Sequence, residues 1–308
     1  MALDTLASIT GKVLLRCPSA SSLLVRDWVS NAFRRVAERR SWSWLIKRGQ
    51  FLTVASYSTG TCTVTHNSTA VTGAGTAWTN AMIGRQFFVS GNPIYTITAV
   101  GGVGSLTLDD EYGGDTNATA SYQIYKAYME VPTDFHAFIS VWDTATGRTL
   151  NTTTTQRELQ AADTERGSQG DPSLLAFLDY YLPTGQTVMV PRYEMWPHPV
   201  AKAVYPFIYE MRPTDLEDSG ATLPRFLHGD VLLEMSLEQA AMWPGPSKDK
   251  INPYFNRDLA VMHRNRSEQL IMEMERQDEE VGVQNIYYDN SEDGFQLGAD
   301  YWQKHAIQ

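Results

Sequence analysis

The stretch SSLLVRDWVSNAFRRVAERRSWSWLIK, residues 21–47, predicts the helix around which the rest of the chain is organised. Apolar residues recur on one face at the helical spacing, at Val25, Trp28, Val29, Ala32, Phe33 and Val36. The hydroxyl of Ser21 or Ser22 can cap the start by accepting from a free N–H group of the first turn. Trp42 and Trp44 follow, and their spacing by two places them on one side of an extended segment. We therefore expect an amphipathic helix with a buried, rigid exit.

The opposite face of this helix is basic, and it carries Arg26, Arg34, Arg35, Arg39 and Arg40. One interpretation is a solvated face on a helix that packs on a core. The other is a contact with a negative surface, either nucleic acid or another subunit. The residues alone leave both interpretations open.

Charge is distributed unevenly along the 308 residues, whose formal net charge is −10. Residues 1–48 hold nine basic and three acidic side chains, a balance of +6, so the remainder carries −16. Opposite charge at the two ends suits head-to-tail association of identical chains. Cys17 and Cys62 suggest no disulfide scaffold. The start lacks the apolar stretch of a signal peptide and no apolar run reaches about 18 residues, so we expect a protein made in the cytoplasm without a membrane partner.

Segment composition predicts an α+β fold in five parts. The N-terminal helices of a helical domain take residues 1–49, and an inserted small β-barrel or sandwich module takes residues 50–131. An antiparallel β meander takes residues 132–212. C-terminal helices at residues 213–280 complete the helical domain as a bundle, and residues 281–308 form an extended tail.

Acidic residues gather at the end of the long helix expected over residues 253–280, namely Glu273, Glu275, Asp278, Glu279 and Glu280. Negative charge there opposes the helix dipole by about a few tenths of a kcal/mol. These carboxylates therefore suggest a partner, such as a neighbouring subunit, although solvated charge is the plainer interpretation.

The C-terminal stretch has no clear period but is rich in aromatic residues, at Tyr287, Tyr288, Phe295, Tyr301 and Trp302. Disordered tails are usually poor in aromatic residues, and exposed rings act as anchors in interfaces. We expect this tail to dock on a partner or a neighbouring subunit. The alternative is that it folds back on its own domain.

No constellation of residues points to catalysis. The Gly101–Gly104 run lacks the lysine and the strand–turn–helix setting of a phosphate loop, and none of the six histidines is paired as a metal ligand. A carboxylate pair chosen among Glu130, Asp134 and Asp143 would be arbitrary. We expect no enzyme activity, no metal and no cofactor.

The order of segments resembles the head-to-tail adaptor, or connector, proteins of tailed bacteriophages, including the tail accessory factor and tail tubular A-type proteins. Three stretches carry the resemblance: RDWVSNAFRRVAERRSWSWL near the start, PRYEMWPHPVAKAVYPFIYEMRPTDL, and ATLPRFLHGDVLLEMSLEQAAMW before a second long helix. The segment from Ala70 to Gly114 also looks like a β module that recurs in phage structural proteins, although many adaptors lack it.

The resemblance implies a virion neck protein without enzyme activity. Its copies, commonly twelve, would form a homo-oligomeric ring under the portal, with the helical domains interlocked. The ring would continue the channel through which double-stranded DNA passes without specific binding, and it would carry tail, nozzle or fibre proteins. The C-terminal segment would reach the portal protein, and the basic helix would face DNA, the portal or a neighbouring subunit.

Two other functions compete with the adaptor. In a carbohydrate-binding or tailspike-associated protein, exposed rings such as Trp78 and Tyr95 would stack on sugars, although such rings are more often core residues of a small β-fold. A peptidoglycan hydrolase is the third candidate, and no pair of acid and nucleophile in the sequence favours it.

Overall fold

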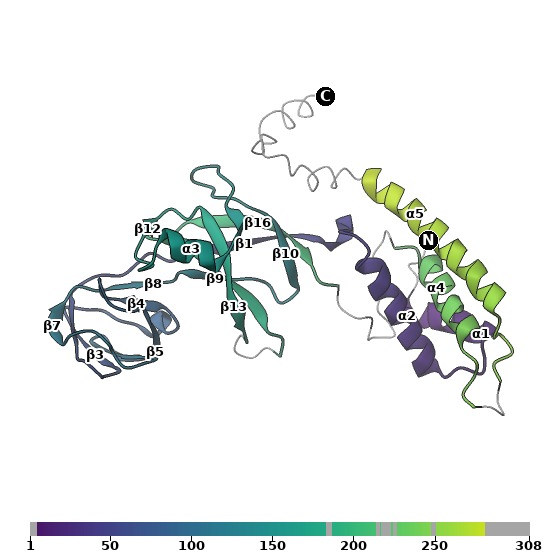
Figure 1. Cartoon of the computed structure of the whole chain (residues 1–308), viewed down its shortest axis with the longest axis horizontal. Coiled ribbons are helices and arrows are strands. Elements are labelled where there is room, and N and C mark those ends of the chain that lie inside the picture. Colours follow the sequence, from purple (N-terminus) through teal and green to yellow (C-terminus); the bar gives the residue numbers. More distant parts are fainter. Residues whose placement is uncertain are drawn as a thin grey trace, which may run out of the picture. The chain divides into compact units, whose positions relative to one another are not determined.

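The chain divides into two compact units, each described here by itself. Our computed structural model describes residues 5–182, 187–213, 216, 223, 227–247 and 251–280. The first unit combines the two ends of the chain, Met1–Ile46 and Met211–Gln308, and the second is Lys47–Glu210. The first is helical and the second is mainly strands (Figure 1), so the α+β class expected from the sequence is confirmed.

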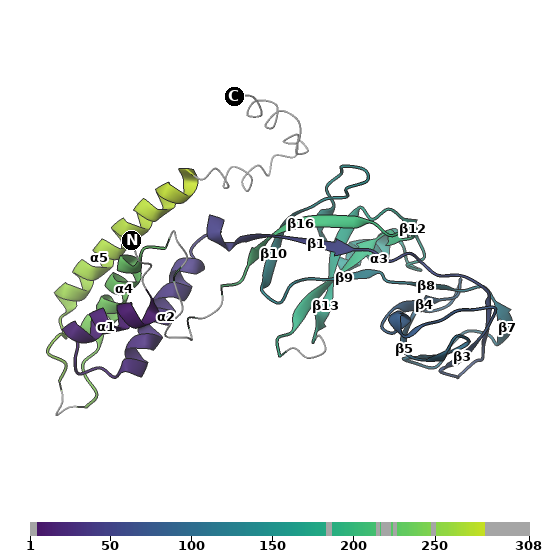
Figure 2. The ribbon, with the colours of Figure 1, turned by 180° about the vertical axis from the view of Figure 1, so that it is seen from behind.

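The helical unit contains α1 (Leu6–Arg16), α2 (Ser22–Ala37), the short 3-10 helix η1 (Ser43–Leu45), α4 (Gly229–Met242) and α5 (Arg257–Glu280). Ser21 caps α2 by accepting from the Leu24 N–H, as the sequence predicts. In Figures 1 and 2, α4 lies alongside α5, and α1 and α2 pack on α4 and on each other. Helices from the two ends of the chain therefore build one domain.

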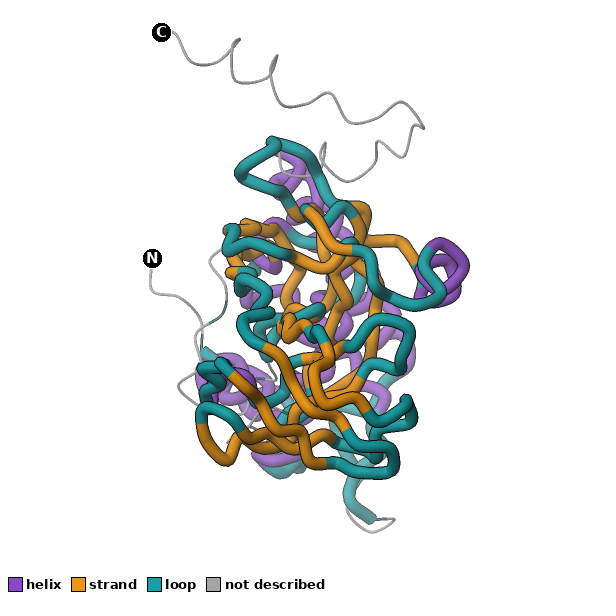
Figure 3. Tube along the Cα trace, turned by 90° about the vertical axis from the view of Figure 1, so that its left-hand side faces the viewer, coloured by secondary structure: helices purple, strands orange, loops and turns teal. Residues whose placement is uncertain are grey.

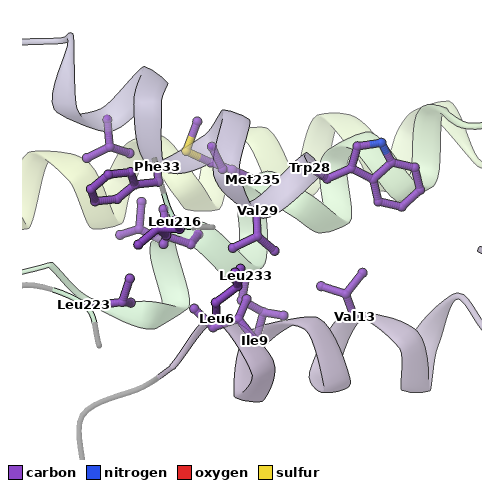
Figure 4. Packing of buried hydrophobic residues seen from close by; sticks show 14 of the residues in the cluster. Leu6, Ile9, Val13, Trp28, Val29, Phe33, Leu216, Leu223, Leu233 and Met235 are labelled. Atoms are coloured by element: carbon purple, nitrogen blue, oxygen red, sulfur yellow. The ribbon is translucent and has the colours of Figure 1, made fainter. Parts of the chain in front are cut away.

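One apolar core holds these helices together. All six apolar residues expected on the buried face of α2 are buried. They meet Leu6, Ile9 and Val13 of α1 and residues of α4 such as Leu233 and Met235 (Figure 4). Ten of the fourteen residues of α4 are buried, which fits a central helix that other helices cover on several sides.

The exit from α2 differs from the extended segment that the tryptophan spacing predicts. The helix ends at Ala37, and Trp42 caps the 3-10 helix η1. Trp42 is buried and its Nε1 donates to the carbonyl oxygen of Val36 at 2.7 Å, whereas Trp44 is only half-buried. The turn is held because the Trp42 indole donates to a carbonyl of the last helical turn, which also accepts from the Arg39 N–H at 3.3 Å.

Within the second unit, seven short strands form one curled sheet in the order β7-β2-β3-β6-β5-β4-β8. Figure 3 draws the strands of the chain in orange. The strands of the curled sheet are β2 (Thr61–Val64), β3 (Ala70–Ala74), β4 (Gln86–Phe88), β5 (Tyr95–Gly102), β6 (Ser105–Leu108), β7 (Asn117–Ala120) and β8 (Gln123–Tyr125), with the 3-10 helix η2 (Asn80–Met82) between β3 and β4. Every neighbouring pair is antiparallel. Its concave side encloses an apolar cluster of its own.

The remaining strands form three smaller sheets. Their orders are β1-β16-β10, β11-β13-β14-β9 and β12-β15. The strands are β1 (Ile46–Leu52), β9 (Tyr128–Glu130), β10 (Phe135–Val141), β11 (Asn151–Thr154), β12 (Gln169–Gly170), β13 (Leu174–Tyr181), β14 (Val190–Trp196), β15 (His198–Pro199) and β16 (Val204–Met211).

The expectation of a purely antiparallel meander over residues 132–212 is wrong. β11 pairs with β13 in parallel, as does β12 with β15. A parallel pair needs a crossover, and the helix α3 (Gln156–Ala162) supplies it between β11 and β13. In addition, β1 comes from the N-terminal side and pairs with β16, so this region does not fold from its own residues alone.

Candidate interaction site at the end of the helical unit

Arg39 follows the end of α2 and bridges two carboxylates of α5. Its Nη1 lies 2.6 Å from Oε2 of Glu268, and its Nε lies 2.9 Å from Oε1 of Glu275. The hydrogen bond to Glu268 is the main cause that raises the pKa of the Arg39 guanidinium above its ordinary value. All three side chains are partly exposed, so solvent screens these pairs.

Arg40 makes a second connection to the same end of α5. Its Nη1 lies 3.7 Å from Oε1 of Glu279 and donates to the backbone carbonyl of Glu275 at 3.5 Å. The guanidinium also lies 5.3 Å from the centre of the Trp42 ring, within the range of a cation–π contact. Arg40 is therefore held on one side by α5 and on the other by the exit of α2.

Asp278 is the buried centre of this site, with an exposed fraction of 2%. Its Oδ1 and Oδ2 accept from the Ser43 backbone N–H at 3.1 and 3.2 Å, and it also accepts from the Ser43 hydroxyl. Ser43 is the first residue of η1, so the carboxylate satisfies donors at the start of that turn. These donors compensate the burial of the carboxylate.

These contacts tie the end of α5 to residues 39–43, directly before the chain enters its second unit. Acidic residues at a helix C-terminus, which oppose the dipole, find their partners here within one chain. The structure thus brings Arg39 and Arg40 together with Glu275, Asp278 and Glu279. A neighbouring subunit that bound these groups would have to compete with the internal pairs. Glu268 belongs to the site but was missed, because it lies outside the acidic cluster in the sequence.

The other residues expected on these surfaces either lie on α2 and α5 or fall outside the described part of the chain. On α2, Arg34 and Arg35 are exposed and Arg26 is half-buried, and Glu273 is exposed on α5. Glu280 is the last residue of α5, and its side chain is not among the described ones. The tail residues Tyr287, Tyr288, Phe295, Tyr301 and Trp302 lie outside the described residues.

A buried polar cluster between α4 and α5 was also missed. His263 Nδ1 lies 2.5 Å from Glu234 Oε2, and the Tyr254 hydroxyl lies 2.8 Å from His263 Nε2. Both ring nitrogens of His263 are thus hydrogen-bonded, one to the Glu234 carboxylate and the other to the Tyr254 hydroxyl. Glu234 and His263 are 29 positions apart, and no local sequence pattern joins them. The cluster fixes α5 against α4.

The rings that would have stacked on sugars belong to the core of the curled sheet. Trp78 and Tyr95 are both buried. The Nε1 of Trp78 donates to the Tyr122 hydroxyl at 2.9 Å, and the Tyr95 hydroxyl accepts from the Gly113 N–H at 2.7 Å. The expectation that these rings are exposed is wrong, because a small β-fold needs them to fill its interior. The carbohydrate-binding alternative loses the residues on which it was based.

Two features are absent from the described part of the chain. No group of three or more His, Cys, Asp or Glu side chains there is arranged to hold a metal ion. No described helix is both long enough and apolar enough to cross a bilayer.

Comparison with known proteins places most of these elements in one family. The model of the family described as SU10 adaptor protein matches residues 92–286, more than half of the chain. The match runs from just before β5 to just past the end of α5, so it includes Asp278 and the acidic side of the site, while α2 and nearly all of the aromatic tail lie outside it. No curated protein matches the chain.

Proposed function

Because the chain belongs to the SU10 adaptor protein family, a family of phage structural adaptors, we propose that it forms a ring-shaped head-to-tail adaptor in the virion. In this proposal the ring docks under the portal, continues the DNA channel and carries tail, nozzle or fibre proteins. It has no enzyme activity. The observation that carries the proposal is the family match over residues 92–286, which spans parts of both units.

The polar clusters of the helical unit support a structural role. Arg39 and Arg40 are paired with carboxylates of α5, and His263 is held between Glu234 and Tyr254. Groups that are satisfied in this way stabilise a fold and are not poised to act on a substrate. A rigid helical unit is what a ring needs when it must bear the load between head and tail.

The net charge of −10 also suits the wall of a DNA channel. Affinity for duplex DNA comes mainly from lysine and arginine side chains that neutralise phosphates. A protein with a large negative charge lets DNA pass without holding it. Twelve copies, arranged head to tail, are the assembly that we propose.

Two surfaces are proposed for contacts in this assembly. The basic side of α2, with the exposed Arg34 and Arg35 and the half-buried Arg26, would face the portal, DNA or a neighbouring subunit. The aromatic tail, residues 281–308, would dock on the portal. The internal pairs of Arg39 and Arg40 keep the end of α5, where this tail starts, in a fixed place.

Deletion of residues 281–308 tests the tail. The shortened chain should keep the circular dichroism spectrum and the melting temperature of the full chain, since the described core lies within residues 5–280. It should no longer co-sediment with purified portal rings, while the full chain does. A matched control is the full chain with Glu273→Gln, which changes one exposed carboxylate of α5. Equal binding by the shortened and the full chain would refute tail docking.

A further inference from the structure

The end of the β13–β14 hairpin carries a group of exposed apolar side chains. We call residues 177–182 and 187–191 the hairpin end. Six of their side chains are between 37% and 61% exposed: Phe177, Leu178, Tyr180, Leu182, Val188 and Met189. Scattered single apolar residues on a surface are ordinary, but a contiguous group usually marks an interaction site.

The hairpin end is a two-stranded ribbon without further strands on either side. β11 pairs with β13 only as far as Ala176, and β9 pairs with β14 only from Arg192 onward. Beyond these points, no strand of the described residues pairs with either edge. Figure 1 shows β13 running away from the rest of its sheet. An isolated two-stranded ribbon is at best marginally stable in water, so a partner would stabilise it.

The two edges are not equivalent. On the β14 side, Pro191 lies opposite Tyr180, and a proline has no N–H group to give to a ladder. On the β13 side, Phe177–Tyr181 offer an edge that no proline interrupts. A partner that adds a strand would therefore do so along β13, and the apolar side chains would pack against it.

The charge of the hairpin end and its unpaired strand edges indicate which class of partner, among DNA, lipid and protein, can bind there. Asp179 is the only charged residue of the hairpin end, and Arg192 neutralises it with its Nε 2.7 Å from Oδ1. With no cation left over, the hairpin end lacks what DNA phosphates require. Insertion into lipid is disfavoured too, because free N–H and C=O groups of a ribbon edge are costly in hydrocarbon. A protein surface remains.

We propose that the hairpin end docks on a second copy of this chain and forms a contact between neighbouring subunits. Two copies that each carry a net charge of −10 repel one another on average, although residues 1–48 are basic. The hairpin end is apolar and electrically neutral, so two copies can approach there without that cost. The inference deepens the proposed ring and rests on it, since a ring gives every copy a neighbour for its hairpin end.

The test is sedimentation velocity of the full chain and of the double variant Leu182→Asp/Met189→Asp over a wide range of concentration. The matched control is Ile83→Asp/Val103→Asp, which puts the same charges at apolar positions of similar exposure, 47% and 67% against 54% and 57%. Leu182→Ser/Met189→Ser separates lost apolar contact from added charge. Circular dichroism and thermal melting of each variant show that the fold is kept.

We expect the mass of the full chain and of the control to rise above the 34.5 kDa of one chain as concentration increases. The association constant of both hairpin variants should fall at least about tenfold, as for buried residues at the centre of an interface. Association of the hairpin variants equal to that of the full chain would overturn the inference. A full chain that stays at 34.5 kDa throughout, or that floats with phosphatidylcholine vesicles through these residues, would overturn it as well.

The outcome separates this inference from the proposed function. If the protein is found at the virion neck but Leu182→Asp/Met189→Asp does not change its association, the proposed function stands and the hairpin contact is refuted. If the chain associates through the hairpin end but is absent from the neck, the hairpin contact stands and the proposed function is refuted.

Discussion

Two aromatic-rich β regions of the same unit use their rings in opposite ways. In the curled sheet, Trp78 and Tyr95 are 2% and 6% exposed and their polar atoms are bonded to neighbours. At the hairpin end, Phe177 and Tyr180 are 42% and 61% exposed. Similar composition therefore gives no guide to function until burial is known. Aromatic side chains that are buried and hydrogen-bonded within the fold contribute stability, whereas exposed aromatic side chains are available to a partner.

The largest expected effect comes from removing an inward ring. Trp78→Ala should lower the free energy of unfolding by about 3–5 kcal/mol, because the indole fills the core of the curled sheet. Tyr180→Ala, at the hairpin end, should change it by no more than about 0.5 kcal/mol. Urea denaturation measures both. Equal losses in the two variants would show that the hairpin ring is also part of a core.

The same comparison between buried and exposed side chains can be made for carboxylates, with Asp278 as the buried one. Asp278→Ala should cost about 1–3 kcal/mol, since it leaves the Ser43 N–H and hydroxyl without their acceptor. Glu273→Ala, on the exposed side of α5, should be nearly neutral. Denaturation monitored by tryptophan fluorescence compares the two. A neutral Asp278→Ala would mean that water replaces the carboxylate without cost.

The stabilisation that the Asp163 carboxylate contributes to the fold should depend on pH. Desolvation alone would raise the pKa of this carboxyl, but hydrogen bonds from the Ser168 backbone N–H and the Trp196 Nε1 outweigh it and lower the pKa to about 2. A carboxyl with a lowered pKa in the folded state stabilises the fold above its unfolded pKa of 3.8.

That stabilisation should therefore be complete at neutral pH and disappear as the pH falls from about 4 towards 2. Asp163→Asn should cost about 1 kcal/mol at pH 7, discounted for partial exposure, and progressively less as the pH falls from about 4 through 2. Asp171→Asn, at an exposed position, is the control. Thermal melts of both variants across this pH range measure the effect. A loss of stability in Asp163→Asn that persists at low pH would contradict the lowered pKa of Asp163.

The smallest expected effect concerns Arg39. Its pairs with Glu268 and Glu275 are partly exposed, so Arg39→Ala should lower stability by about 0.5–1 kcal/mol and by less at high salt. Arg35→Ala, at an exposed position within α2, is the comparison. A decrease in the free energy of unfolding of more than about 2 kcal/mol, unchanged by salt, would mean that the Arg39 pairs behave as buried ion pairs.

Local features of the fold could be predicted from the sequence because they depend on nearby residues. The spacing of Val25, Trp28 and Val29 predicted the buried face of α2, and Ser21 its cap. The turn at Trp42 was missed, because it depends on one hydrogen bond back to Val36. The parallel pairing of β11 with β13 was missed, since a run of strands with prolines reads as a meander when the crossover helix α3 is only seven residues long.

The candidate site was predictable only in its parts. The sequence indicates a basic helix and an acidic helix end, but the contacts between Arg39 and Glu275 join residues 236 positions apart. No periodic pattern contains that information. The hairpin end likewise falls within the region predicted to form strands, yet its apolar runs LLAFLDYYL and QTVMV do not say which face is exposed. Exposure is set by where β11 and β9 end, which only the folded chain reveals.

Antibody labelling of virions tests the central claim most directly. Antibodies raised against the full chain would be located by electron microscopy on intact particles and on particles stripped of their tails. The account predicts label confined to the neck between head and tail. Label along a fibre or spike, or no label on any particle, would contradict it.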